Sequence, residues 1–207
     1  MKNKLQIKDS ALKIAVDGES ASGKGTICKA LAKEFDLFYC QSSLFYRKLA
    51  KAVIENHLES LDEIKNFIIS SNYLENISED GLYKPDVTSK SSEIASIAEV
   101  RALLEIPQKN MAKSKNRIIM EGRDIGTNIM PDADVKLYIT APIEDRTKRR
   151  YAQLKQNLEE NISLEKVRED LETRDKRDKE SLSSPLKPAE DAIIIQNSNL
   201  SLDEFYK

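Results

Sequence analysis

A glycine-rich run near the start of the chain has the residue types that bind a polyphosphate. In order, it contains Gly18, Glu19, Ser20, Ala21, Ser22, Gly23, Lys24, Gly25 and Thr26. Backbone N–H groups can approach phosphate oxygens closely where glycines permit a positive φ. Lys24 could contact a transferred phosphoryl group, and the Thr26 hydroxyl could ligate Mg²⁺. The run therefore predicts a phosphate-binding loop, the P-loop.

The order of residues after the lysine narrows the class of protein. Gly25 separates Lys24 from Thr26, whereas the commoner form of this loop has Ser or Thr directly after Lys. The form seen here is typical of nucleoside and nucleotide kinases. The sequence also lacks the Asn-Lys-x-Asp motif that reads guanine, which argues against a GTPase switch.

Arginines could form a second anion site, for a phosphoryl acceptor that itself carries a phosphate. A planar guanidinium binds phosphate oxygens in a bidentate fashion. The candidates lie in four groups: Ser42–Arg47, Arg101, the run Glu121–Thr127 with Arg123, and the helical set Arg146, Arg149 and Arg150. A single arginine more often forms a surface salt bridge, and the spacing of the helical pair Arg174 and Asp178 fits such a salt bridge as well as it fits a site. Two groups, however, follow predicted strands.

Apolar runs alternating with helical patterns predict the elements that position these residues. Five short strands are expected at Leu12–Asp17, Leu37–Cys40, Ile118–Met120, Val135–Ile139 and Ala192–Ile195. Helices are expected at Thr26–Glu34, Tyr46–Asn56, Ile94–Ala112 and from Pro142 to about Lys179. This alternation predicts an α/β fold with a parallel central sheet of about five strands flanked by helices. Ligands of such sheets bind beyond the carboxyl ends of the strands.

Residues 1–207 are expected to form a single domain with two additions to the core. Residues 57–93 are polar and rich in turn signals, so we interpret them as an insert. Residues 144–182 are a charge-dense helical arm, in which Asn161-Ile162-Ser163 provides a helix N-cap between two helices.

Composition excludes several classes of function. The chain has 33 basic and 35 acidic residues, a net charge of −2, so nothing global favours binding to nucleic acid or an anionic membrane. His57 is the only histidine, which excludes His-based metal sites and Ser-His-Asp triads. Cys28 and Cys40 are expected to be buried, reduced thiols. No apolar leader or spanning segment is evident, and we expect a cytoplasmic protein.

Taken together, these motifs resemble bacterial cytidylate kinases, over residues 12–205. The resemblance rests on the P-loop, on Ser42–Arg47, on Glu121–Thr127 followed by Pro131-Asp132-Ala133, and on Ser184-Pro185-Leu186. It implies a P-loop fold of the nucleoside monophosphate kinase type, with a monophosphate-binding insert and a short lid. It also implies a monomeric enzyme that phosphorylates CMP and dCMP by in-line transfer from ATP with Mg²⁺.

The resemblance also assigns roles to individual residues. Lys24, Arg123, Asp124 and Arg149 would be catalytic, with Arg149 closing over the phosphates from the lid. The acceptor nucleotide would contact Ser20, Ser42, Arg47, Ser92, Arg101, Arg123, Asp124 and Asp178. Arg47, Arg101 and Arg123 would bind its phosphate, Ser92 would lie near its base and Asp178 near its sugar.

Three departures from the family pattern leave alternatives open. Glu121 stands where Asp is commoner, Ser181 stands where the family usually has Arg, and the stretch between Thr88 and Ser92 is shortened by roughly two to three helical turns. The alternatives are another small-acceptor kinase such as a UMP/CMP kinase, a P-loop NTPase that uses hydrolysis as a switch, and a weakly active nucleotide-binding protein.

Overall fold

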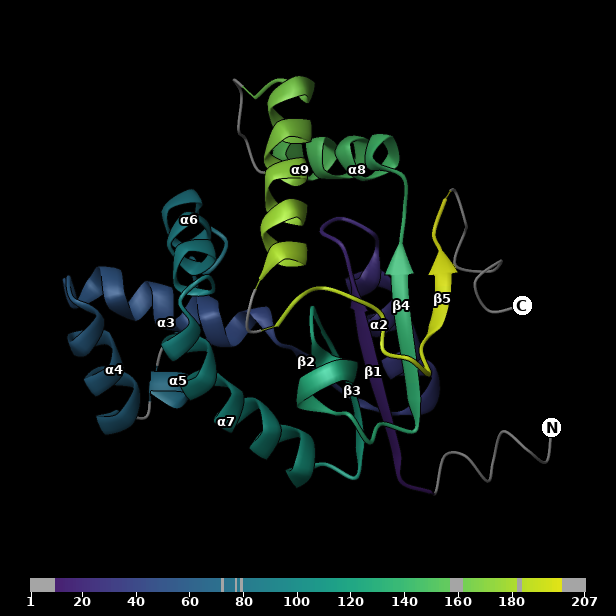
Figure 1. The fold of residues 1–207 in the computed structure, drawn as a ribbon, viewed down its shortest axis with the longest axis horizontal. Helices are drawn as coiled ribbons and strands as arrows, with labels where there is room; N and C mark the ends of the chain where they lie inside the picture. The colour runs from purple at the N-terminus through teal and green to yellow at the C-terminus, as the bar shows by residue number, and fades with distance from the viewer. Residues whose placement is uncertain are drawn as a thin grey trace. The chain divides into compact units, whose positions relative to one another are not determined.

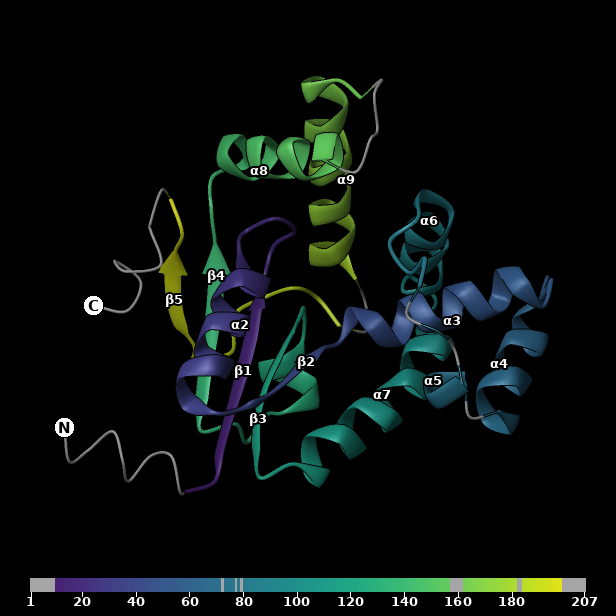
Figure 2. The ribbon, with the colours of Figure 1, turned by 180° about the vertical axis from the view of Figure 1, so that it is seen from behind.

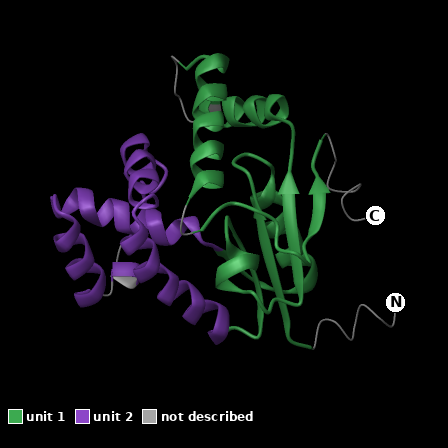
Figure 3. Ribbon diagram, viewed as in Figure 1, with its two compact units in different colours: residues 1–40, 115–207 green, residues 41–114 purple. Residues whose placement is uncertain are grey.

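The computed structural model describes residues 10–71, 73–76, 78, 80–156, 162–181 and 184–198. The chain divides into two compact units (Figure 3). Unit 1 comprises residues 1–40 and 115–207, and unit 2 comprises residues 41–114. The segment 57–93, interpreted from the sequence as an insert, lies within unit 2, which begins earlier and ends later in the chain.

The sheet has five parallel strands in the order β2-β3-β1-β4-β5, which confirms the predicted fold class. The strands are β1 (Leu12–Gly18), β2 (Phe38–Gln41), β3 (Arg117–Gly122), β4 (Val135–Thr140) and β5 (Ile193–Gln196). Ile14 of β1 lies opposite Ile119 of β3 and Val135 of β4. Because the strands are parallel, their carboxyl ends share one edge of the sheet, and α8 follows β4 at that edge (Figures 1 and 2).

Branched apolar side chains from the central strands form the core of unit 1. Val16, Ile119 and Ile139 are fully buried, and Ile27 and Leu31 of α2 (Lys24–Phe35) pack against them. Cys28 and Cys40 are buried free thiols, as expected. Burial raises the pKa of both thiols, that of Cys40 to about 12, so neither is a reactive thiolate near neutral pH.

The charged arm after β4 consists of two helices, α8 (Ile143–Gln156) and α9 (Leu164–Glu180). Ser163 caps α9 by accepting a hydrogen bond from the Lys166 amide at 3.1 Å. The cap confirms the predicted junction at Ser163, while Asn161 lies outside the described residues. Leu154, Val167 and Leu171 form a small apolar core between the helices, so the arm is a packed hairpin.

Unit 2 is helical and has an apolar core of its own. Its helices are α3 (Ser43–Glu55), α4 (Leu61–Ser70), α5 (Tyr73–Asn76), α6 (Pro85–Ile94) and α7 (Ala98–Ser114). Leu49, Val100 and Leu104 are fully buried in the core of this unit. Among the described residues of both units, no helix is long and apolar enough to cross a membrane.

Two predicted helix boundaries in unit 2 were wrong. The helix expected from Ile94 begins only at Ala98, because α6 runs to Ile94 and a turn follows it. The helix expected from Tyr46 already begins at Ser43, where the Phe45 amide bonds to the Ser42 carbonyl. In each case an apolar pattern continues across the boundary, and periodicity alone does not mark it.

Candidate active site

The P-loop joins the carboxyl end of β1 to the start of α2, and its shape depends on two glycines. Gly18 has a φ of 144°, and a Cβ there would lie 1.9 Å from the Ile139 carbonyl oxygen. Gly23 has a φ of 94°, and a Cβ there would lie 2.3 Å from Nδ2 of Asn197. Any larger residue at either position would collide with its neighbours. Ala21 also has a positive φ, 59°, which is uncommon for a residue with a side chain.

Lys24 is the first residue of α2 and folds back over the loop. Its ammonium group donates a hydrogen bond to the Glu19 carbonyl oxygen at 2.6 Å. Burial, together with the positive charge of Arg123, lowers the pKa of Lys24 to about 7, although Glu121 opposes the shift. Thr26, two residues further along α2, is exposed. Lys24 is therefore a partly desolvated cation beside the helix N-terminus, where an anion would stabilise its charged form.

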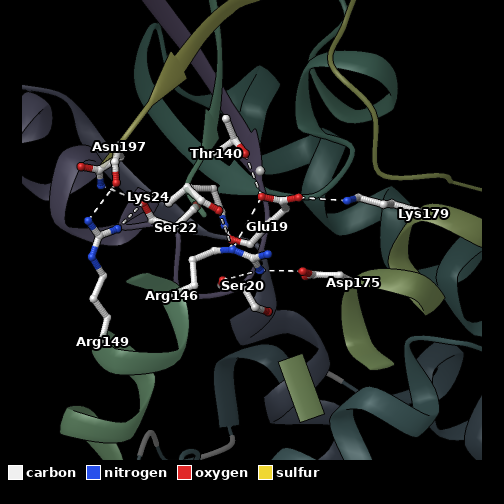
Figure 4. A network of polar contacts seen from close by, with 12 residues as sticks. Glu19, Ser20, Ser22, Lys24, Thr140, Arg146, Arg149, Asp175, Lys179 and Asn197 are labelled. Atoms are coloured by element: carbon white, nitrogen blue, oxygen red, sulfur yellow. Dashed lines mark hydrogen bonds and ion pairs between the residues drawn. The ribbon is translucent and has the colours of Figure 1, made fainter. Parts of the chain in front are cut away.

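Several donors bond to the carbonyl oxygens of the loop from outside (Figure 4). Arg123 donates to the Gly18 carbonyl and to Oγ of Ser20. Arg146 donates to the Ser20 carbonyl at 3.4 Å. The Ser22 carbonyl accepts from Arg149 at 3.4 Å and from Nδ2 of Asn197 at 2.7 Å, and Arg149 also donates to the Asn197 carbonyl at 2.8 Å. We refer to these donors as the loop brace: Arg123, Arg146, Arg149 and Asn197.

The last two turns of α9 reach the same region through three charged side chains. Asp175 accepts a hydrogen bond from Arg146 at 2.5 Å, Asp178 pairs with Arg123 at 2.8 Å, and Lys179 pairs with Glu19 at 2.9 Å. Positions 175, 178 and 179 share one helix face by their spacing. Asp178 was predicted from the sequence, whereas Asp175 and Lys179 were missed. The same spacing was the only signal that could have found them.

Glu19 places a carboxylate within the P-loop. Its side chain is 9% exposed; Oε1 accepts from Lys179, and Oε2 accepts from the Thr140 hydroxyl at 2.9 Å. Arg146 lies 3.7 Å from Oε2. Burial raises the pKa of Glu19, but the bonds from Lys179 and Thr140 and the charge of Arg146 outweigh burial, so the net shift is downward. The carboxylate is thus ionised and compensated.

Three acids stand at the strand ends beside the loop. Asp17 accepts hydrogen bonds from the Ile125 and Gly126 amides, each at 2.8 Å, and burial nevertheless raises its pKa to about 6. Asp124 precedes the one-turn π-helix Ile125–Ile129 and accepts from Nδ2 of Asn128 at 3.2 Å. Asp17 therefore fixes the turn that follows Arg123 and Asp124.

The third acid, Glu121, is held between β2 and the P-loop. Oε1 of Glu121 accepts from the Tyr39 hydroxyl at 2.5 Å, and a Cβ added to Gly25 would lie 3.3 Å from the same oxygen. A serine or threonine in place of Gly25 would crowd this carboxylate. The close approach gives a physical reason for the glycine between Lys24 and Thr26.

The donor types here suit Mg²⁺, which binds oxygen ligands and usually takes one or two from the protein and others from substrate phosphates. Thr26 offers a hydroxyl, and Asp17 and Glu121 offer carboxylates close to Lys24, whose pKa they affect. Among the described residues no group of three or more His, Cys, Asp or Glu side chains could hold a metal ion by itself. A bound nucleotide would have to complete such a site.

The two candidate arginines of unit 2 are oriented by contacts within that unit. One terminal nitrogen of Arg47 donates to the Leu82 carbonyl at 2.8 Å and to the Thr88 hydroxyl at 2.9 Å. The guanidinium of Arg47 lies 4.7 Å from the centre of the Tyr83 ring. Arg101 donates to the Ala95 carbonyl at 3.3 Å, and its guanidinium lies 5.8 Å from the centre of the ring of Tyr46.

The two candidate serines of unit 2 differ in burial. Ser42 is buried directly before α3, and Ser92 lies on α6, half-buried. The neighbouring Ser91 is the buried residue of that pair, and its hydroxyl donates to the Thr88 carbonyl at 2.9 Å. Ser92 is thus the more accessible of the two adjacent hydroxyls.

The sequence comparisons with known families and proteins point to one family. The sequence profile of the family described as "Cytidylate kinase" matches residues 14–207. The cytidylate kinase of Rickettsia felis is 46% identical over 92% of this chain and 86% of its own length, and that of Rickettsia akari is 45% identical over the same shares. Similar solved structures include shikimate kinase from Bacteroides thetaiotaomicron, with 12% identity and a TM-score of 0.44 over 90% of this chain and 86% of that one; this resemblance is too weak to bear on function.

In this chain a P-loop follows strand β1 of a parallel sheet, and the charged helical arm contacts that loop through Lys179. The chain matches one kinase family over nearly its whole length. The chain belongs to the cytidylate kinase family.

Proposed function

We propose that the protein transfers the terminal phosphoryl group of ATP to CMP and dCMP, forming CDP or dCDP and ADP. The observation that carries the proposal is the P-loop, in which Lys24 stands at the N-terminus of α2 and the loop brace holds the carbonyl oxygens. This arrangement leaves the helix N-terminus and a partly buried cation to bind phosphate oxygens.

Alignment and charge neutralisation perform the reaction. A phosphate oxygen of the acceptor attacks the γ-phosphorus, and the bond from this phosphorus to the oxygen of the departing ADP breaks. Lys24 and Arg149 stabilise negative charge that spreads over the transferred group. Arg123 orients the acceptor phosphate, with Ser20 and Asp178 beside it. All nine residues from Gly18 to Thr26 line the ATP site.

The acceptor would be bound from unit 2 as well. Arg47 and Arg101 bind its phosphate, and Ser42 and Ser92 contact its nucleoside. The observed contacts of Arg47 with Leu82, Thr88 and Tyr83 restrict its guanidinium, which reduces the entropy lost on binding.

Mg²⁺, when bound, would neutralise part of the charge on the phosphate oxygens. Thr26 is the protein ligand proposed for it. Asp124 would help to hold this ion or to orient Arg123, and it need not act as a base, because a monophosphate is already ionised near pH 7. Exclusion of water by the α8–α9 arm prevents hydrolysis of ATP. In keeping with the family, we expect a cytoplasmic monomer.

An ADP-release assay tests the proposal with CMP, dCMP, UMP, AMP and no acceptor. Release that requires CMP or dCMP supports it. Equal rates with UMP would instead make the protein a UMP/CMP kinase. Release without any acceptor would make it an NTPase, and no release in spite of ATP binding would leave a nucleotide-binding protein.

A further inference from the structure

Glu19 is the one acidic residue within the P-loop, residues 18–26. A carboxylate in this place opposes the binding of a polyphosphate, because like charges repel strongly where solvent is partly excluded. Its backbone carbonyl also accepts from Lys24, so the residue lies in direct contact with the catalytic cation. The loop can favour anions only if the charge of Glu19 is offset by neighbouring groups.

The charge of Glu19 is balanced within a cluster of four charged side chains whose charges sum to zero. Among the described residues, Arg146 and Lys179 are the cations paired with its carboxylate, while Lys24 bonds to its backbone carbonyl. Arg146 also bonds to the buried Asp175 at 2.5 Å (Figure 4). The cluster thus holds two acids, Glu19 and Asp175, and two bases, Arg146 and Lys179. Without Lys179 it would carry one net negative charge next to the loop.

Lys179 differs from Arg146 in how firmly it is held. The side chain of Arg146 is 6% exposed, whereas that of Lys179 is 51% exposed at the C-terminal end of α9. Its compensating charge therefore depends on the position of α9, and any motion of the arm that separates Lys179 from Glu19 would change the potential at the P-loop.

We propose that Lys179 is a positioning residue that neutralises Glu19 and thereby sets the affinity of the P-loop for ATP. The proposal rests on the proposed function, since it takes ATP as the ligand of the loop. It assigns to α9 a second role beside closure, which is to supply the charge that the loop lacks.

The first test compares Lys179→Met with Lys176→Met, in the full chain, by equilibrium binding of ATP. Lys176 is exposed on α9 one turn earlier, so both variants lose the same charge from the same helix. We expect Lys179→Met to weaken ATP binding about three- to tenfold, a range reduced for the partial exposure of the pair. Lys176→Met should stay within about twofold of wild type.

The second test separates charge compensation from a tether between α9 and the loop. Glu19→Gln removes the negative charge and keeps an oxygen that can accept from Thr140. The double variant Glu19→Gln/Lys179→Met should bind ATP more tightly than Lys179→Met, recovering most of the loss of about three- to tenfold, although it also lacks the ion pair. Glu19→Gln alone should bind ATP at least as tightly as wild type. If Lys179 instead acts as a tether between α9 and the loop, both Glu19→Gln and the double variant should bind ATP more weakly than wild type, because both lack the ion pair.

The outcomes distinguish failure of the proposed function from failure of the proposed role of Lys179. If wild type fails to bind ATP, the proposed function is wrong. If wild type binds ATP but Lys179→Met and Lys176→Met behave alike, or the double variant stays as weak as Lys179→Met, the role of Lys179 is wrong and the function stands. Glu19→Gln provides a test that remains valid even if the Lys179→Met variant does not fold. Weaker ATP binding by Glu19→Gln would also overturn the inference.

Discussion

Candidate residues in the two units are held in different ways. In unit 1, Arg123 and Arg146 each contact an aspartate of α9 and a carbonyl of the P-loop, and Lys179 contacts Glu19. In unit 2, the observed contacts of Arg47 are with a carbonyl, a hydroxyl and an aromatic ring, and those of Arg101 are with a carbonyl and a ring.

This difference indicates two ways to prepare a site for anions. Unit 1 matches opposite charges around a loop, so the strength of its site depends on the sum of those charges. In unit 2, the contacts of Arg47 with Leu82, Thr88 and Tyr83 fix the direction of its guanidinium, so geometry contributes to that site. Variants that change charge should therefore act most strongly in unit 1, and variants that keep charge but remove a contact should be measurable in unit 2.

The largest effect is expected in unit 1 from Lys24→Ala. Loss of the cation at the N-terminus of α2 removes an electrostatic stabiliser of the transferred group, and kcat should fall at least about a hundredfold. Folding should survive, because the loop shape depends on Gly18 and Gly23. Steady-state kinetics and thermal unfolding are the measurements. Near-normal turnover would contradict the assignment of the P-loop as the catalytic site.

The next effect tests the geometry of unit 2. Arg47→Ala should weaken the interaction with CMP by about 1.5–3 kcal/mol, measured as a rise in its KM, with little change for ATP. Thr88→Val keeps the shape of the side chain but removes the oxygen that accepts from Arg47, and should cost about 0.5–1.5 kcal/mol in the same parameter. An equal loss for ATP and CMP in Arg47→Ala would show that the two anion sites are not separate.

A smaller effect concerns the proton on Lys24. Since its pKa is lowered to about 7, the amine is mostly neutral at pH 8, and the charge of bound ATP should raise this pKa and draw a proton from the buffer. Calorimetry at pH 8 in buffers of different ionisation enthalpy should detect the uptake of nearly one proton. At this pH the terminal phosphate of ATP is already fully ionised, so ATP itself contributes no proton to the balance. Lys24→Arg, which is always charged, should take up none. Absence of uptake by wild type would refute the lowered pKa.

The smallest effect is expected from Glu121→Asp. The change keeps the charge of unit 1 and shortens the side chain by one methylene, at the cost of the 2.5 Å contact with Tyr39. If charge is what matters there, kcat should stay within about twofold of wild type, or rise slightly. A loss of tenfold or more, matched by Tyr39→Phe, would show that geometry governs this part of unit 1 too.

The sequence predicted the sheet and the loop well because both are local signals. Apolar runs marked all five strands, and the P-loop motif lies in nine consecutive residues that run from the end of β1 into the start of α2. The N-cap at Ser163 was equally local. Features of this kind depend on residues that are close together in the sequence, so they can be read directly from a single sequence.

The partners of the loop were not predictable in the same way. Lys179 is 160 residues from Glu19, and Asn197 is 175 residues from Ser22. In the sequence, Lys179 looks like any charge on a solvated helix, and Asn197 is one polar residue after a strand. Helical spacing could place Lys179 on the same face as Asp178, but it does not say what that face contacts. Only the packing of α9 and β5 onto the core brings Lys179 and Asn197 to the P-loop.

The loop brace has a consequence for the thermodynamics of binding. Ordering one residue of a flexible backbone costs about 1–2 kcal/mol of conformational entropy. Because Arg123, Arg146, Arg149 and Asn197 already restrain the loop at Gly18, Ser20 and Ser22, this entropy is lost when the chain folds. A nucleotide then meets a loop whose shape is fixed in advance. Its affinity reflects the contacts it makes, with little subtracted for ordering the protein around it.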